Sequence, residues 1–216
     1  MHTLSGLDAT FLYLETPQTP MHVGSFCLYA LPDTPRYSLH RAIRAHIAQR
    51  LHLAPVFTRK LGFMPLDLGH PVWLPDPDVD LDFHIRKVKG RRLTLAQARA
   101  LATELHTGLI DRNRPLWEFH VFDRVHCPDG TVCGAMYSKI HHATLDGKAG
   151  TVLAQAMLDI GPVPRSVPPP SAKSARAARP GVGRMLGAVF SNSLAQYAKL
   201  VRALPEAAQA IGSTVA

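Results

Sequence analysis

Two neighbouring segments joined by a tight turn constrain the fold of this chain more than any other feature. Residues 116–125 (LWEFHVFDRV) alternate apolar and polar side chains, and residues 131–142 (TVCGAMYSKIHH) form a second run rich in strand-forming residues. Between them, residues 127–130 (CPDG) have the composition of a turn. Because alternation with a period of two is typical of strands, the sequence predicts that these two segments pair as a hairpin.

Helical patterns occur on both sides of this hairpin. Apolar side chains that repeat every three or four residues predict helices over 39–51 and 94–110, with Thr94 as a cap, and a helix from 147 to 160. Ser5 followed by Asp8 resembles a capping box, so residues 6–14 are predicted to form a short helix.

Two other regions favour extended structure. The apolar residues 22–31 (HVGSFCLYAL) predict a buried strand, and residues 57–89 contain four prolines among short extended pieces, the last of which is FHIRKVK. Strands and helices thus alternate along the chain. This order predicts an α/β (α+β) fold, in which a mixed sheet is flanked by helices.

The basic excess of the chain is confined to its C-terminal part. Of the 24 basic and 16 acidic residues, seven basic and one acidic follow Asp159, so the first 159 residues carry 17 basic and 15 acidic groups. A nearly neutral domain is not typical of nucleic-acid binding. Residues 161–180 contain six prolines and are predicted to be a linker, and apolar repeats over 186–204 predict an amphipathic helix.

Several classes of protein are excluded by simple patterns. The chain has three cysteines and no CxxC pair, so a disulfide framework, a zinc ribbon and a thioredoxin motif are not expected. No apolar run reaches the length of a membrane span, and the first residues do not resemble a secretory signal. We expect a reducing, cytoplasmic setting. Cys27 and Cys133 are expected in the core, and His120 and His126 at the surface.

The sharpest motif is the sequence HHATLDG, which runs from His141 to Gly147. On a strand, His141 and His142 point to opposite faces, which argues against a shared metal ion. A histidine at a strand end suits a general base, because its ordinary pKa of about 6.5 lies near neutral pH. Asp146 can hold the following turn through backbone bonds or an arginine, and Gly147 lets the chain turn. The alternative is that both histidines are buried in the core, with their ring nitrogens hydrogen-bonded, and have only a structural role.

This motif fits the HHxxxDG signature of the CoA-dependent acyltransferase superfamily, which includes chloramphenicol acetyltransferase and the condensation domains of peptide synthetases. Two other segments narrow the resemblance. They are residues 7–24, with LDATFL, Glu15 and PMHVG, and residues 111–118 (DRNRPLWE). In this order, over residues 5–160, the three segments resemble the bacterial wax ester synthase/diacylglycerol acyltransferase family.

The resemblance implies transfer of a fatty acyl group from acyl-CoA, as co-substrate, to diacylglycerol or a long-chain alcohol. It implies no cofactor and no metal. His142 would be the general base, and the rest of the motif would orient the loop. The implied site consists of His142, His141, Asp146 and Gly147 as catalytic motif, with Pro115, Leu116 and Trp117 as a substrate-binding segment. Trp117 is expected mainly to pack in the core.

Members of this family consist of two similar halves with the active-site tunnel between them. The resemblance therefore predicts a chloramphenicol-acetyltransferase-like N-terminal half over 1–160, the linker over 161–180 and a helical tail over 181–216, with the second half absent from this chain. The expected partners are that half, acyl-CoA, a lipid alcohol, and the surface of the inner membrane or of lipid droplets. Two alternatives remain: an acyltransferase with another acceptor, and a non-catalytic lipid-binding or interaction half-domain.

Overall fold

A five-stranded mixed sheet forms the centre of the computed structural model, which describes residues 2–63, 69–90, 92–145, 147–159, 161 and 163–169. Its strands are β2 (His22–Ala30), β8 (Val132–His141), β7 (Trp117–His126), β5 (Ile85–Lys87) and β6 (Leu93–Thr94). The first three strands run antiparallel in the order β2-β8-β7, while β5 and β6 both pair with β7 in parallel. The predicted mixed sheet is confirmed.

The hairpin of β7 and β8 has the predicted pairing. Its register places Trp117 opposite Ile140 at one end and His126 opposite Val132 at the other, with an irregularity between Phe122 and Val125. Gly130 closes the turn with a φ of 84°, a backbone conformation that glycine adopts at little cost. The hairpin therefore carries the histidine motif at the end of the sheet opposite its turn.

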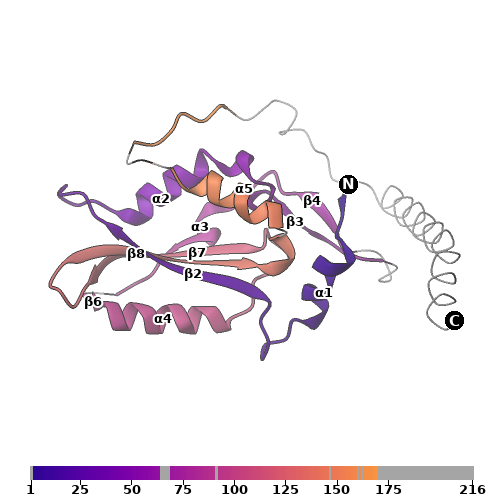
Figure 1. Cartoon of the computed structure of the whole chain (residues 1–216), viewed down its shortest axis with the longest axis horizontal. Helices are drawn as coiled ribbons and strands as arrows, with labels where there is room; N and C mark the ends of the chain where they lie inside the picture. The colour runs from indigo at the N-terminus through magenta and orange to yellow at the C-terminus, as the bar shows by residue number, and fades with distance from the viewer. Residues whose placement is uncertain are drawn as a thin grey trace, which may run out of the picture.

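Helices cover both faces of this sheet, as predicted (Figure 1). α2 and α5 lie on one face and α4 lies on the other, while α1 lies beside the end of the sheet where β8 stops. The helices are α1 (Gly6–Leu14), α2 (Leu39–Ala48), α3 (Leu81–His84), α4 (Leu95–Thr107) and α5 (Gly147–Met157). Short 3-10 helices occur at η1 (Leu51–Leu53), η2 (Pro55–Phe57) and η4 (His142–Thr144).

The region with many prolines forms short elements, as expected. β1 (His2–Thr3), β4 (Val72–Pro75) and β3 (Arg59–Gly62) make a small antiparallel sheet. The alternation in FHIRKVK is shortened to the three residues of β5, because the Asp80 carboxylate caps α3 through the N–H groups of Asp82 and Phe83. Capping draws the first residues of that run into a helical turn.

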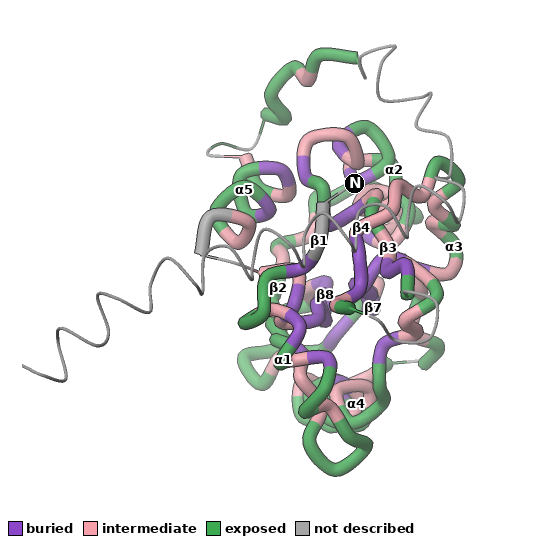
Figure 2. Tube along the Cα trace, turned by 90° about the vertical axis from the view of Figure 1, so that its right-hand side faces the viewer, coloured by how far each residue is buried: buried purple, intermediate pink, exposed green. Residues whose placement is uncertain are grey.

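The prediction that 22–31 form a buried strand is wrong in its burial. β2 does form, but most of its residues are exposed or half-buried (Figure 2). Cys27 is exposed rather than in the core. β2 lies at the edge of the sheet and pairs only with β8 in the described part of the chain. An apolar run cannot reveal whether its strand becomes an edge.

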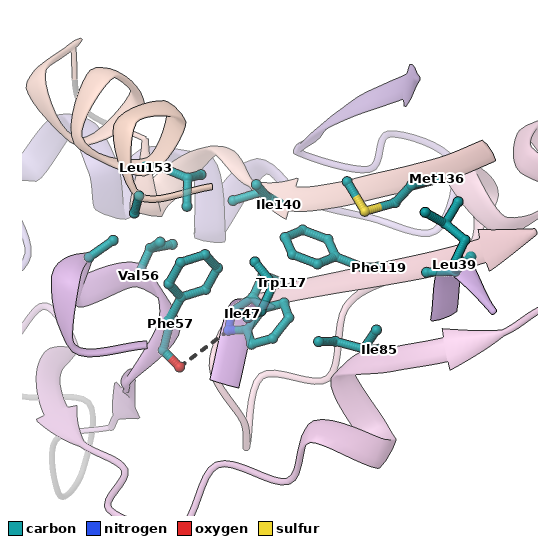
Figure 3. Close-up of a cluster of buried hydrophobic side chains, with 13 residues drawn as sticks. Leu39, Ile47, Val56, Phe57, Ile85, Trp117, Phe119, Met136, Ile140 and Leu153 are labelled. Atoms are coloured by element: carbon teal, nitrogen blue, oxygen red, sulfur yellow. Dashed lines mark hydrogen bonds between the residues drawn. The ribbon is translucent and has the colours of Figure 1, made fainter. Parts of the chain in front are cut away.

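The main core lies between the face formed by β7 and β8 and the helices α2 and α5 that cover it (Figure 3). Trp117, Phe119 and Val121 alternate along β7 on this face and are fully buried. They pack with Ile47 of α2, Leu153 of α5 and Phe57 of η2, among others. A second cluster under α4 contains Ala98, Ala102, Phe122, Ala135 and Tyr137.

The C-terminal predictions fall only partly on described residues. Positions 163–169 of the predicted linker contain neither helix nor strand. They are tied to the domain where His52 Nε2 donates a hydrogen bond to the Pro168 carbonyl over 2.9 Å. The predicted helical tail over 181–216 lies outside the described residues. Within the described residues, no helix is long and apolar enough to cross a membrane.

Candidate active site

The histidine motif lies where β8 ends and the chain turns toward α5. His141 is the last residue of β8, His142 begins η4, and Gly147 is the first residue of α5. The His142 N–H donates to the Met21 carbonyl over 2.8 Å, and the Thr144 hydroxyl donates to the His141 carbonyl over 2.7 Å. Asp146 lies outside the described residues, so its expected role in holding the turn stays a prediction.

His141 is fully enclosed and points away from solvent. The Ala143 N–H donates to His141 Nδ1 over 3.1 Å, so this nitrogen carries no proton and the neutral ring has its proton on Nε2. Nε2 lies 3.3 Å from Glu15 Oε1. Burial lowers the pKa of His141 to about 4, despite the nearby Glu15 carboxylate. A neutral, buried imidazole of this kind holds the loop in shape.

Glu15 connects the three sequence segments that carry the family resemblance. Its carboxylate accepts the Met21 N–H over 3.0 Å and an Arg112 N–H over 2.9 Å, and its side chain is fully buried. Arg112 also donates to the Leu12 carbonyl over 2.7 Å. Burial alone would raise the pKa of Glu15, but Met21, Arg112 and His141 outweigh it and lower the pKa below its ordinary value. Glu15 is therefore a carboxylate anion at neutral pH.

Glu15 and Arg112 belong to the sequence motifs, but the sequence alone assigns neither residue a contact. They are 97 residues apart in the chain, and only the tertiary structure brings the loop that holds Arg112 to the end of α1. One signal could have found them. A buried histidine next to a strand end needs a polar partner, and both segments supply charged residues.

His142 has a different environment from His141. It is half-buried, and its ring stacks on Phe11 of α1 with the ring centroids 4.0 Å apart and an angle of 22° between the planes. Its Nδ1 is buried and has no hydrogen-bond partner among the described residues. Phe11 thus holds the imidazole by ring contact rather than by a hydrogen bond. No three His, Cys, Asp or Glu side chains in the described part of the chain gather as a metal site.

A cavity of about 480 Å³ adjoins this loop on the side of α1, η2 and α5. Ala143 and Thr144, which directly follow His142, form part of its wall. Most of the other lining side chains are apolar, and they include Leu4, Leu7, Val56, Trp73 and Val152. A space of this size and polarity suits the apolar portion of a small molecule.

The structure places Pro115, Leu116 and Trp117 in the interior. All three are buried, and none of them lines the cavity beside the histidine loop. The Trp117 indole N–H donates to the Phe57 carbonyl over 3.3 Å (Figure 3), and its ring stacks on His84 at 4.3 Å. Their arrangement supports a packing role, in which the segment fixes the start of β7 next to the end of β8.

The expectation that His120 lies at the surface is wrong, whereas His126 is exposed as expected. His120 is 3% exposed, because β7 is an inner strand and α4 covers this face. Its Nε2 lies 3.1 Å from a Glu118 carboxylate oxygen, and Lys139 Nζ lies 3.6 Å from the same oxygen. Alternation in the sequence cannot distinguish a polar strand face in water from one under a helix.

Comparisons with known proteins show which proteins this chain resembles. The sequence profile of the wax ester synthase/diacylglycerol acyltransferase catalytic domain matches residues 4–216. Two Mycobacterium tuberculosis proteins, both named as diacylglycerol O-acyltransferases, are 36% identical over 168 residues and 34% identical over 159 residues. These matches cover 76% and 72% of this chain, but only 32% and 34% of the relatives. The chain thus spans about a third of the length of the curated relatives that it matches.

Solved structures show the same fold. The wax ester synthase/diacylglycerol acyltransferase of Marinobacter aquaeolei VT8 matches with a TM-score of 0.59 and 29% identity, over 77% of this chain and 41% of that one. The starter condensation domain of rhizomide synthetase matches with a TM-score of 0.51 and 13% identity, over 72% of this chain and 36% of that one. The second likeness concerns the fold alone.

Proposed function

The chain belongs to the wax ester synthase/diacylglycerol acyltransferase family, and from this premise we propose that it is the histidine-bearing half of an acyltransferase. Its reaction moves a fatty acyl group from acyl-CoA to the hydroxyl group of diacylglycerol or a long-chain alcohol. The observation that carries the proposal is the position of His142, half-buried on an anchored loop beside an apolar cavity. Its acceptors are poorly soluble in water, so the enzyme works at a membrane or lipid-droplet surface.

His142 acts as the general base in this proposal. Its imidazole takes the proton of the acceptor hydroxyl while the oxygen attacks the thioester carbonyl and forms the new C–O bond. The tetrahedral intermediate then collapses, the C–S bond breaks, and the CoA thiolate takes the proton from the imidazolium. The stacking of Phe11 on the imidazole supports this role, because it orients the ring while the buried Nδ1 has no hydrogen-bond partner in the described part of the chain.

The remaining residues of the site serve as supports. The buried side chains of His141 and Glu15 and the half-buried Arg112 form a chain of polar contacts that supports the loop. Asp146 and Gly147 complete the turn into α5 in the proposed site. The cavity beside η4 receives apolar carbons of a substrate, since its wall includes Leu4, Val56 and Trp73. The second half of the enzyme supplies the opposite wall of the active site and contacts to CoA.

The test is the variant His142→Ala, measured in this chain together with the C-terminal half of the enzyme. We expect acyl transfer to fall by about 10²–10⁴-fold, because a positioned general base contributes that much. CoA release followed by thiol titration gives the rate. His126→Ala is the matched control, since it removes an exposed imidazole at the far end of the hairpin.

Two results would contradict the proposal. Activity of His142→Ala within roughly threefold of the wild type would remove this residue from the role of base. Absence of acyl transfer by the wild type with both halves present, combined with retained binding of a lipid alcohol, would favour a non-catalytic lipid-binding half-domain. Circular dichroism of the variant distinguishes loss of the base from loss of the fold.

A further inference from the structure

A pair of thiols lies at the turn of the β7–β8 hairpin, far from the histidine loop. Cys127 Sγ and Cys133 Sγ are 3.0 Å apart, and both cysteines are free and half-buried. This turn is at the end of the sheet opposite α1 (Figure 1). Neither residue contributes to the proposed acyl transfer, so the pair calls for an explanation of its own.

The hairpin register explains why the two thiols meet. The Cys127 N–H donates to the Thr131 carbonyl over 2.9 Å, which makes these two residues cross-strand neighbours. Cys133 lies two positions beyond Thr131 and therefore on the same face of the hairpin. Diagonal neighbours of this kind come within reach of each other's side chains. The sulfur atoms need to approach by only about 1 Å to reach bonding distance.

The surroundings of the two thiols favour a disulfide over a metal site. The backbone around the turn is held by the bond from the Gly130 N–H to the Cys127 carbonyl, so a bridge joins positions that are already ordered. The described residues provide no third metal-binding side chain beside the two thiols. Both cysteines retain some exposure to solvent, so a small oxidant can reach the sulfur atoms.

We propose that Cys127 and Cys133 form a reversible disulfide site. A peroxide oxidises the two thiols to a disulfide that cross-links the hairpin. The Cys127 thiolate attacks the peroxide, takes up one oxygen as sulfenic acid and, with a proton, releases one water. The Cys133 sulfur then attacks this sulfenic sulfur, the S–S bond forms, and a second water leaves with the Cys133 proton. The two thiols lose two electrons in total, and hydrogen peroxide gains them.

Burial and the neighbouring Cys127 raise the pKa of Cys133 to about 11, so Cys133 is a thiol at neutral pH, which fits its place in the second step. The disulfide closes a loop of seven residues and reduces the conformational entropy of the unfolded chain. It lies at the end of β8 away from His142, so we expect it to change stability rather than the proposed catalysis.

Peptide mapping tests the site directly on the full chain. Trypsin cleaves after Arg124 and Lys139, so residues 125–139 form one peptide that holds both thiols, while Cys27 falls in another. After treatment of the native protein with hydrogen peroxide and then iodoacetamide, we expect this peptide to be about 2 Da lighter than its reduced form and not alkylated. Treatment with a thiol reductant should restore two alkylation sites.

Variants separate this bridge from general oxidation. Cys133→Ser and Cys127→Ser should each lose the lighter peptide, whereas Cys27→Ser should retain it. The oxidised wild type should melt roughly 5 °C higher than the reduced protein, and the two hairpin variants should show no such rise. A peptide that stays doubly alkylated while Cys27 is oxidised would overturn the proposal. So would disulfides found only between chains on a non-reducing gel.

Discussion

Glu15 is a fully buried carboxylate whose partners come from three separate segments of the chain. At the scale of single residues, this side chain links the end of α1 to the histidine loop. Its anionic charge faces Arg112, and its other oxygen faces His141 Nε2. Removal of this charge leaves a guanidinium without its partner and two buried N–H groups less well satisfied.

We therefore expect Glu15→Gln to lower the free energy of unfolding by about 2 kcal/mol, because glutamine keeps the shape but not the charge. Arg112 is 32% exposed, and solvent therefore limits the cost of its lost partner. Urea unfolding measures the change. Glu104→Gln on the exposed side of α4 is the matched control and should have an effect below about 0.5 kcal/mol. Equal stability of the two variants would mean that Glu15 does not anchor the loop.

At the scale of elements, α4 shows how side chains set both ends of a helix. The Thr94 hydroxyl accepts a hydrogen bond from the Gln97 N–H, and Gln97 Oε1 accepts one from the Thr94 N–H, so the capping box is complete. At the other end, Lys139 of β8 donates to the carbonyls of Leu105 and Gly108 over 3.0 and 2.9 Å. The helix is thereby attached to the strand that ends in the histidine motif.

Loss of the N-cap should weaken this helix measurably. We expect Thr94→Ala to lower the free energy of unfolding by about 1 kcal/mol, because the first turn of α4 loses its side-chain acceptor. Thr103→Ala in the same helix exposes no backbone donor and should change stability by less than about 0.5 kcal/mol. Thermal or urea unfolding of the two variants provides the comparison. If both variants were equally stable, the capping box would contribute nothing in this context.

At the scale of the whole molecule, buried histidines make stability depend on pH. Burial lowers the pKa of His141 to about 4, and burial also lowers the pKa of His22 and of His84. Each group is neutral in the folded protein but binds a proton in the unfolded chain below about pH 6.5. The contribution of these histidines to the free energy of unfolding is therefore complete above about pH 6.5. It is lost as the pH falls toward their pKa values in the folded protein.

We expect the free energy of unfolding to fall by about 2–3 kcal/mol between pH 7 and pH 4 on account of His141 alone. Urea unfolding across this range measures the slope. His141→Gln should flatten the slope, because it removes the group that takes up the proton on unfolding, while the control His126→Gln at the exposed hairpin end should change it less. A slope that is the same in wild type and His141→Gln would show that His141 is not held neutral by the fold.

The sequence by itself determined the local structure and the place of the motif. The β7–β8 hairpin and the caps at Ser5 and Thr94 follow from periodicity, turn residues and capping residues, all of which act between near neighbours. The same patterns place the histidine motif at the end of β8, although the strand predicted over 131–142 ends one residue earlier, at His141, and His142 begins η4. The family resemblance also followed from short segments in the right order. These features depend on contacts within a few residues, so the sequence predicts them.

Only the tertiary structure decided which distant residues share an environment. Glu15 lies beside His141 because α1 packs against η4, Arg112 reaches Glu15 from the loop before β7, and His120 is buried because α4 covers its strand. The same packing leaves β2 at an exposed edge, although its composition is that of a buried strand. Burial and charge pairing depend on how whole elements pack, and periodicity along the chain contains no information on that arrangement.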